Sequence, residues 1–288
     1  MAVNNLSMET KQQVILLTGA SSGIGYSTAE MLLRQGHIIY GASRRVERMQ
    51  SLSAAGLRPV CLDVTDEAGI GAVVDRIIAE QGRIDVLINN AGYGFFGAIE
   101  DVPLEEARRQ LEVNVFGMAA LIRKVMPYMR AQGGGRIINI ASMAGRVVLP
   151  MGGWYHVSKY AVEALSDALR LESGQFGIKV VLIEPGGIKT DWGLIAADHL
   201  SQTSVGGAYE ELSRETASGI RKTYQSSWLS KPEVIARAVS RAVNSRRPRI
   251  RYTVGFGARI SVLLHTLLPA RLFDRLVSRL YLTADRWL

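Results

Sequence analysis

A tyrosine and a lysine four positions apart could carry the chemistry of this chain of 288 residues. Residues four apart lie on one face of a helix, so the side chains of Tyr155 and Lys159 are expected to point the same way. A free phenol has a pKa of about 10 and is a poor base near neutral pH, so it needs a neighbouring cation. Lys159 can provide that charge, and the pair therefore predicts a site that donates and accepts a proton.

Ser142 precedes this pair, at the end of a predicted strand. Its hydroxyl can donate a hydrogen bond to a substrate oxygen and stabilise charge that develops in a transition state. A Tyr-x-x-x-Lys pair by itself is more often the polar face of a surface helix, so the assignment depends on the other motifs. His156 follows the tyrosine directly and points to another helix face, which indicates a structural role.

A glycine-rich turn, T-G-A-S-S-G-I-G over residues 18–25, follows the first apolar run. Gly19 permits a tight exit from a strand, Gly23 lets the backbone approach a pyrophosphate, and Gly25 allows close helix packing. The N-terminus of the next helix offers unpaired N–H groups and a positive dipole end to phosphates. The turn thus predicts a dinucleotide site.

Short runs rich in valine and isoleucine alternate with longer helical patterns, which is typical of βαβ units. The runs are apolar throughout, as expected for parallel strands covered on both faces. We therefore expect one α/β domain, a doubly wound parallel sheet of the Rossmann type with helices on both faces, over residues 14–258. The predicted strands are Val14–Thr18, Ile38–Ala42, Pro59–Leu62, Val86–Asn89, Arg136–Ala141, Lys179–Glu184 and Ile250–Val254.

Together these motifs resemble the short-chain dehydrogenase/reductase family over roughly residues 14–190, most closely its NADP(H)-preferring hydroxysteroid and retinol-type branch. Further blocks match where the family contacts the adenine, borders the cofactor beside the fourth strand, and cradles the nicotinamide carboxamide. The resemblance implies a cofactor site that consists of Gly19, Ser21, Ser22, Gly23, Ile24, Gly25, Asp63, Val64, Asn90, Ala91, Gly92, Pro185, Gly186, Ile188 and Thr190, with Tyr155 and Lys159.

The resemblance also implies a reaction, the interconversion of an alcohol and a ketone or aldehyde by hydride transfer. It assigns catalysis to Asn114, Ser142, Tyr155 and Lys159. In the family the residue that matches Asn114 lies on a distorted helix and holds a water that links the lysine to solvent. The alternative is an NADP(H)-sensing regulatory protein of the same fold, but such sensors typically lose the tyrosine or the lysine.

The end of the second predicted strand bears on cofactor choice. Sites that prefer NAD usually place Asp or Glu there to bind the adenosine ribose, whereas this chain has Ser43. Arg44 can clamp the extra phosphate of NADP, and Arg45 is a second candidate. The alternative is that both arginines are ordinary solvated residues at a helix start. Ser22 is not the basic residue that some NADP-preferring members carry, so NADP(H) preference should depend mainly on Arg44.

The composition limits the other function classes. The net charge of +8 is concentrated in arginines beyond Arg214, which indicates a solvated basic face or, alternatively, contact with acidic ligands. No nucleic-acid-binding motif is present. The histidines lack metal-ligand spacing, so we expect no metal. The polar segment 1–13, the lone Cys61 and the lack of a long apolar run favour a cytoplasmic protein with no transmembrane segment.

Two segments lie outside the βαβ rhythm. Residues 191–228 form a long insertion after the sixth predicted strand, typical of a lid. Residues 259–288 form a tail that contains two predicted amphipathic helices on either side of Pro269. The apolar positions of the tail are Ile260, Leu263, Leu264, Leu267, Leu268, Leu272, Leu276 and Leu280, and its arginine stripe is Arg271, Arg275 and Arg279.

We expect the tail to pack on the domain or on a partner subunit of a homodimer or homotetramer; peripheral contact with anionic lipid, even as a membrane-surface scaffold, is the alternative. The compact 3-oxoacyl reductases of the family generally lack such a tail and have shorter insertions, so this chain resembles the branch that acts on bulky lipophilic substrates. The substrate is thus expected to be steroid-, retinoid- or long-chain-like, although side chains of these types near an active site are more often simply core. Candidate pocket residues are Phe95, Phe96, Met151, Trp154 and Trp192.

Overall fold

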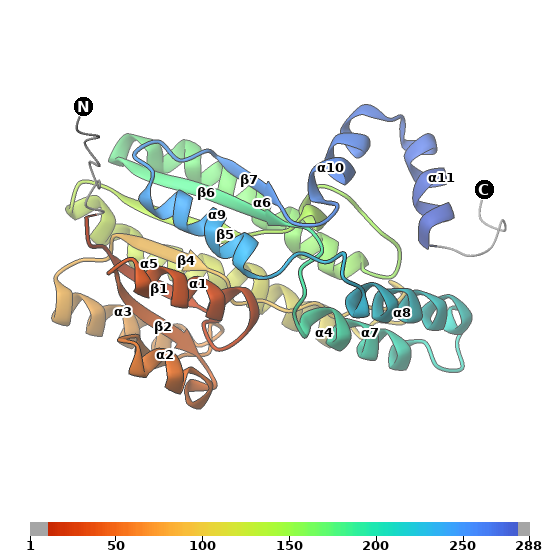
Figure 1. Cartoon of the computed structure of the whole chain (residues 1–288), viewed down its shortest axis with the longest axis horizontal. Coiled ribbons are helices and arrows are strands. Elements are labelled where there is room, and N and C mark those ends of the chain that lie inside the picture. Colours follow the sequence, from red (N-terminus) through yellow and green to blue (C-terminus); the bar gives the residue numbers. More distant parts are fainter. Residues whose placement is uncertain (1–10, 282–288) are drawn as a thin grey trace, which may run out of the picture.

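The protein is built around a seven-stranded parallel sheet with the order β3-β2-β1-β4-β5-β6-β7 (Figure 1). The computed structural model describes residues 11–281; residues 1–10 of the polar N-terminal segment, residues 282–288 of the tail and the side chains of Leu280 and Tyr281 lie outside the described residues. The predicted doubly wound sheet is confirmed. Its strands are β1 (Val14–Thr18), β2 (Ile38–Ser43), β3 (Arg58–Cys61), β4 (Val86–Asn89), β5 (Gly135–Ile140), β6 (Ile178–Pro185) and β7 (Arg251–Val254).

The strand ends differ from the predicted ones by one residue at most, because backbone pairing sets them rather than the limits of an apolar run. In β2, for example, Ser43 pairs with Cys61 of β3, so the strand continues beyond Ala42. The β3 strand accordingly ends at Cys61 instead of Leu62.

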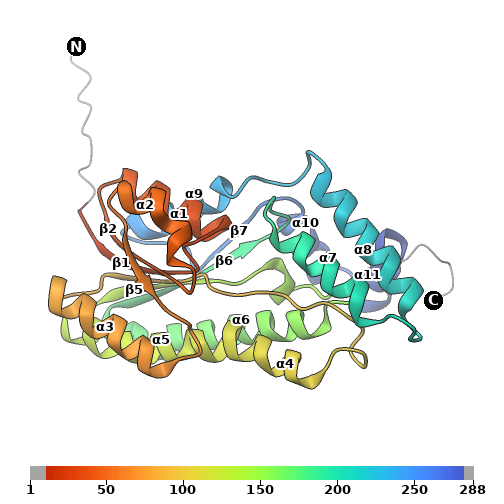
Figure 2. The ribbon, with the colours of Figure 1, turned by 90° about the horizontal axis from the view of Figure 1, so that it is seen from below.

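Helices cover both faces of the sheet, and Figure 2 shows the two layers on opposite sides of it. Successive strand residues point to opposite faces: Ile15 and Leu17 of β1 pack in the core under α1 and α9, whereas Leu16 packs in the core under α3, α5 and α6. The first layer contains α1 (Gly23–Arg34), η1 (Val46–Met49), α2 (Gln50–Ala54) and α9 (Glu233–Asn244), and the second contains α3 (Glu67–Gln81), α4 (Leu104–Leu111), η2 (Glu112–Phe116), α5 (Gly117–Ala131) and α6 (Gly153–Ser173).

The strand order reverses between β1 and β4, which are neighbours in the sheet. Ligands of open α/β sheets bind at such a switch point, beyond the carboxyl ends of the strands. The glycine turn follows β1 and residues 90–92 follow β4, so the fold places the predicted cofactor motifs on both sides of one crevice.

The predicted lid and tail are helical. The insertion consists of α7 (Trp192–Thr203) and α8 (Glu210–Gln225), which pack against each other. The tail forms α10 (Ala258–Leu267), which contacts β7 and η3 (Met143–Gly145), and α11 (Ala270–Tyr281), which follows Pro269 and contacts α10. A further 3-10 turn, η4 (Gly174–Phe176), precedes β6. Every helix in the described part of the chain is too short or too polar to cross a membrane.

Candidate active site

The turn between β1 and α1 has room only for glycine at its critical positions. A Cβ atom on Gly25 would lie 2.1 Å from the carbonyl oxygen of Gly19. Gly19 and Gly23 have φ angles of +67° and +52°, in the left-handed region that disfavours side chains. Ser22 stands at the N-terminus of α1 but its side chain makes no capping hydrogen bond. The N–H groups of α1 and the bare backbone of the turn therefore fit a pyrophosphate.

Thr18, which the sequence analysis did not single out, joins the turn to the end of β4. Its Oγ1 accepts hydrogen bonds from the backbone N–H groups of Asn90 and Ala91, both at 3.0 Å. Asn90 Nδ2 donates in return to the Thr18 carbonyl at 2.9 Å. These bonds span 72 to 73 residues of sequence and fix the two sides of the crevice relative to each other.

Ser43 at the end of β2 contacts the glycine turn directly. Its hydroxyl donates to Ser21 Oγ at 2.8 Å and accepts from the backbone N–H of Arg45 at 3.1 Å. The Arg44 guanidinium lies 3.8 Å from an oxygen of Asp63, and both side chains are well exposed. Such a loose exposed pair stabilises little, so Arg44 remains available to a phosphate.

Asp63 is held in its ionised form. Burial opposes ionisation, but the hydrogen bonds from Thr65 and the charge of Arg44 outweigh it and hold the pKa of Asp63 below its ordinary value. Thr65 donates through its backbone N–H at 3.0 Å and its hydroxyl at 2.8 Å to the same carboxylate oxygen. A carboxylate fixed in this way can accept a hydrogen bond from a ligand that lies beyond β3.

The remaining predicted cofactor residues divide into two groups. Thr190 lies beside the turn, since a Cβ on Gly23 would be 3.3 Å from the Thr190 Cγ2. Gly186 lies against the backbone of Phe256, because a Cβ on Gly186 would be 2.2 Å from the Phe256 carbonyl oxygen. Three others face the interior: Ile24 and Ile188 belong to the core on the α1 side, and Val64 to the core on the α3 side. Their side chains therefore contact the hydrophobic core, and their contact with a cofactor stays a prediction.

The four predicted catalytic residues come from three elements. Tyr155 and Lys159 lie on α6, and Asn114 lies in the π-helical segment η2. Ser142 lies two residues after the end of β5. Lys159 Nζ lies 5.8 Å from the centre of the Tyr155 ring, and the Ser142 side chain hydrogen-bonds Tyr155. Lys159 Nζ also donates to the Ile140 carbonyl at 2.9 Å.

Asn114 is held rigidly by its neighbours. Its Nδ2 donates to the carbonyl of Tyr93 at 2.9 Å and to Ser158 Oγ at 3.0 Å, and its Oδ1 accepts from the Tyr93 N–H at 3.0 Å. A Cβ on Gly92 would lie 3.0 Å from this Oδ1 and 3.9 Å from Lys159 Nζ. Gly92 thus leaves open the space between the asparagine and the lysine.

Burial dominates the ionisation of Tyr155 and Lys159. Burial raises the pKa of the Tyr155 phenol well above its ordinary value; the hydrogen bond with Ser142 lowers it and Tyr224 raises it. Burial lowers the pKa of Lys159 to about 8, although the charge of Glu163 acts to raise it. The phenol is therefore protonated, which is the form that donates a proton to a carbonyl oxygen.

Aromatic side chains cover Tyr155, which is 9% exposed. The Trp192 ring of α7 lies 4.9 Å from the Tyr155 ring and the Phe96 ring lies 5.7 Å from it. Tyr224 of α8, which sequence reasoning missed, packs against Gly193, where a Cβ would lie 2.0 Å from its Cζ. The predicted lid therefore reaches Tyr155.

The other predicted pocket residues are less central. Phe95 stacks on His199 at 4.7 Å, and Met151 packs in the small core beneath α7 and α8 with a φ of +64°. The indole Nε1 of Trp154 is buried without a hydrogen-bond partner among the described residues. His156 holds the loop before α6, because its ring nitrogens bond the Ala144 carbonyl at 2.9 Å and the Leu149 N–H at 3.0 Å.

Glu163 lies two turns after Tyr155 on α6, and the sequence analysis did not single it out. One of its oxygens accepts from Arg251 at 3.1 Å, while the other is buried without a partner among the described residues. Burial and the neighbouring Glu184 raise the pKa of Glu163 to about 7, although Arg251 and Arg146 oppose them. A buried carboxylate network thus lies behind Lys159.

We expect Glu163 to make stability depend on pH. The folded protein binds the proton of the Glu163 carboxyl group more tightly than the unfolded chain does, so this proton stabilises the fold at low pH. Its contribution to the free energy of unfolding falls by about 3 kcal/mol as the pH rises from about 4.5 to about 7. Glu163→Gln keeps the shape and should flatten the dependence, measured by urea unfolding at about pH 5 and about pH 8.

Asp167→Asn is the matched control for Glu163→Gln. Asp167 also lies on α6 and pairs with Arg251, but its hydrogen bond with Arg251 lowers its pKa. This variant should lose stability at both pH values, because the carboxylate that Arg251 stabilises is absent. Equal pH dependence in the unmodified protein and Glu163→Gln would contradict the assignment.

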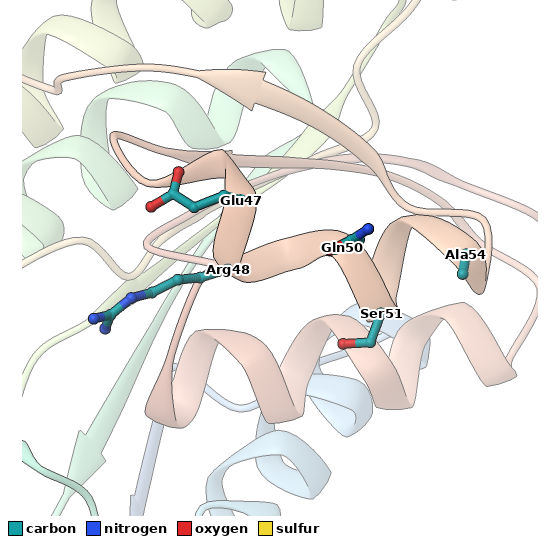
Figure 3. Close-up of a pocket in the computed structure, with 5 residues that line it drawn as sticks. All are labelled: Glu47, Arg48, Gln50, Ser51 and Ala54. Carbon is teal, nitrogen blue, oxygen red and sulfur yellow. The ribbon is translucent and has the colours of Figure 1, made fainter.

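Two further observations concern parts of the chain outside the predicted catalytic residues. Figure 3 shows an open depression on η1 and α2, lined by Glu47, Arg48, Gln50, Ser51 and Ala54, none of which is a predicted site residue. Within residues 11–281, no cluster of three or more His, Cys, Asp and Glu side chains could hold a metal ion.

Several known proteins are similar to this chain over most of its length. A family model described as short chain dehydrogenase matches residues 13–196. The 3-ketodihydrosphingosine reductase of Bacteroides thetaiotaomicron is 48% identical over 178 residues, 62% of this chain and 65% of that protein, so the match spans just under two thirds of that relative. The NADPH-dependent 3-dehydrocapnine reductase of Ornithobacterium rhinotracheale is 34% identical over 274 residues, 91% of this chain and 94% of that protein. A solved short-chain dehydrogenase from Streptomyces avermitilis is 32% identical, with a TM-score of 0.77 over 94% of this chain and 95% of that one.

Proposed function

The chain belongs to the short-chain dehydrogenase family of oxidoreductases, and on that premise we propose that it is an NADPH-dependent reductase of a ketone carried on a long, largely apolar molecule. The observation that supports this most is the convergence of a buried, protonated Tyr155 with Ser142 and Lys159 at the carboxyl edge of the sheet. Proton donation to a carbonyl oxygen is the chemistry that these three groups suit.

In this mechanism the protein handles the proton and the developing charge. NADPH, when bound, supplies the hydride that reduces the carbonyl carbon. Tyr155 donates its proton to the carbonyl oxygen, and the Ser142 hydroxyl donates a hydrogen bond to the same oxygen. Lys159 supplies a positive charge beside the phenolate that remains. Asn114 borders the space next to Lys159 Nζ, where a water can return the proton.

Two observations support the proposed substrate class. Two similar proteins are named as a 3-ketodihydrosphingosine reductase and a 3-dehydrocapnine reductase, which supports reduction of a 3-oxo group. In this chain, the rings of Phe96 and Trp192 pack against Tyr155, and Phe96 also packs against the small apolar core that α7 and α8 help to form. Such a cover excludes water and favours an apolar substituent next to the carbonyl.

The reaction can be tested with a panel of 3-oxo compounds of increasing chain length, alongside short hydroxylated ketones, by following NADPH consumption. We expect kcat/KM to rise with chain length and to be lost in Tyr155→Phe. Tight NADPH binding with no turnover on any member would instead support a cofactor sensor. A preference for the short hydroxylated ketones would overturn the substrate class while leaving the reductase assignment intact.

Cofactor preference is expected to depend on Ser43 and Arg44. The unmodified enzyme should bind NADPH more tightly than NADH, because Arg44 makes charge-assisted hydrogen bonds to the extra phosphate and Ser43 places no carboxylate beside it. Ser43→Asp combined with Arg44→Ala should lower NADPH affinity by about 10- to 100-fold and abolish or reverse the preference.

Fluorescence titration of each cofactor into both proteins measures this preference. Arg48→Ala is the matched control, since it removes a nearby exposed arginine from η1 and should leave both affinities unchanged. Equal NADPH and NADH affinities in the unmodified enzyme would refute the assignment.

A further inference from the structure

The tail helix α10 exposes one continuous apolar face. Ile260, Leu263 and Leu267 are spaced three and four residues apart, and their exposed fractions are 62%, 56% and 69%. Figure 1 shows α10 and α11 extending beyond the end of the sheet as a helical pair. Large apolar side chains gathered on one exposed face indicate an interaction surface.

The neighbouring helix, α11, carries a row of exposed arginines. Residues 258–281 contain four arginines and one acidic residue, Asp274. Arg271, Arg275 and Arg279 are exposed and follow one another every four residues along α11, next to the exposed Leu272. None of these three forms an ion pair with another residue in the described part of the chain.

Two exposed aromatic rings stand at the base of the pair. Phe256, directly before α10, is 43% exposed and its ring lies 6.3 Å from that of Trp228, which is 70% exposed. A tryptophan ring, whose N–H gives it a polar edge, is favoured where an apolar phase meets water. Trp228 suits such a boundary, and Phe256 adds exposed apolar surface beside it.

We propose that α10 and α11 dock on the surface of an anionic lipid bilayer. The apolar face of α10 would enter the boundary between headgroups and acyl chains, and the long arginine side chains of α11 would reach the headgroup phosphates. A second copy of the chain is a poorer occupant, because a two-fold contact through the same surface sets the arginines of one copy against those of the other. This inference is independent of the proposed reaction.

Co-sedimentation of the full chain with vesicles tests the docking. We expect binding to vesicles that contain phosphatidylglycerol in phosphatidylcholine, little binding to phosphatidylcholine alone, and weakening as salt rises. Exchange of Arg271, Arg275 and Arg279 for glutamine should reduce partitioning by at least about tenfold. The variant Ile260→Ser, Leu263→Ser, Leu267→Ser should lose binding as well, and since these side chains are exposed the fold should be retained.

The matched control removes the same charge elsewhere. Arg246, Arg247 and Arg249 are exposed in the loop before β7, and their exchange for glutamine should leave vesicle binding unchanged. Equal loss in both arginine variants, binding that ignores lipid charge, or no binding at all would overturn the proposal. The apolar face would instead belong to an interface with a second copy if two results were found together. The unmodified protein would form a dimer in light scattering and not bind vesicles, and only the serine variant would be monomeric. Tyr155→Phe should bind vesicles normally, which separates failure of docking from failure of the proposed reaction.

Discussion

Replacement of Tyr155 by phenylalanine is expected to lower kcat by roughly a thousandfold while NADPH binding persists. The change removes the transferable proton but keeps the ring, which packs against Phe96 and Trp192 with centre-to-centre distances of 5.7 Å and 4.9 Å. The lid therefore keeps its contacts, and the loss should appear in turnover rather than in folding. Single-turnover reduction with saturating NADPH measures the chemical step, and fluorescence titration measures cofactor affinity.

Tyr160→Phe is the matched control for this experiment. Tyr160 follows Lys159 on α6 and is 38% exposed, so loss of its hydroxyl should leave kcat within about twofold. If Tyr155→Phe retained turnover within about tenfold of the unmodified enzyme, Tyr155 could not be the proton donor.

Most of the sheet could be predicted from the sequence because its inner strands are almost fully buried. The strand Val14–Thr18 is apolar up to its last residue and is followed by a glycine turn, so both the element and its place are visible in one local segment. The turn was equally predictable, since Gly25 is required by a contact only six residues away, with Gly19. Local constraints leave local sequence patterns.

The parts of the site that the sequence did not reveal depend on distant residues. Tyr224 reaches Gly193 from another helix of the lid, and Glu163 pairs with Arg251, which is 88 residues away. Thr18 similarly bonds Asn90 across 72 residues. Common residue types such as Thr, Glu and Tyr carry no spacing that would identify these partners before the fold brings them together.

The tail shows where an amphipathic pattern is ambiguous. The periodicity of residues 260–268 predicts a helix with an apolar face but does not say what covers that face. The sequence favoured packing on the domain or on a partner subunit, which stays a prediction. The structure leaves Ile260, Leu263 and Leu267 more than half exposed, so these side chains can meet a lipid surface.

Lys159→Ala is expected to damage both turnover and cofactor binding, unlike Tyr155→Phe. Lys159 is buried, and its Nζ donates to the Ile140 carbonyl at 2.9 Å beside the ring of Tyr155. The same amine is expected to reach the ribose of the nicotinamide nucleotide, so its removal should cost about a thousandfold in kcat and about tenfold or more in NADPH affinity. Lys159→Met fills the space of the lysine side chain without its charge. It should lose both kcat and NADPH affinity as Lys159→Ala does, which would show that the losses do not come from an empty cavity.

The pH profile gives an independent signature of the lysine. Burial lowers the pKa of Lys159 to about 8, and the cationic form exists below that pKa, so reduction by the unmodified enzyme should slow as pH rises through about 8. The pH profile of Lys159→Met should lack this decline.

Lys124→Ala is the surface control: Lys124 pairs with Asp75 at 3.0 Å in an exposed contact, which contributes little to stability. Unchanged NADPH affinity in both Lys159 variants would contradict the double role and confine Lys159 to the proton step.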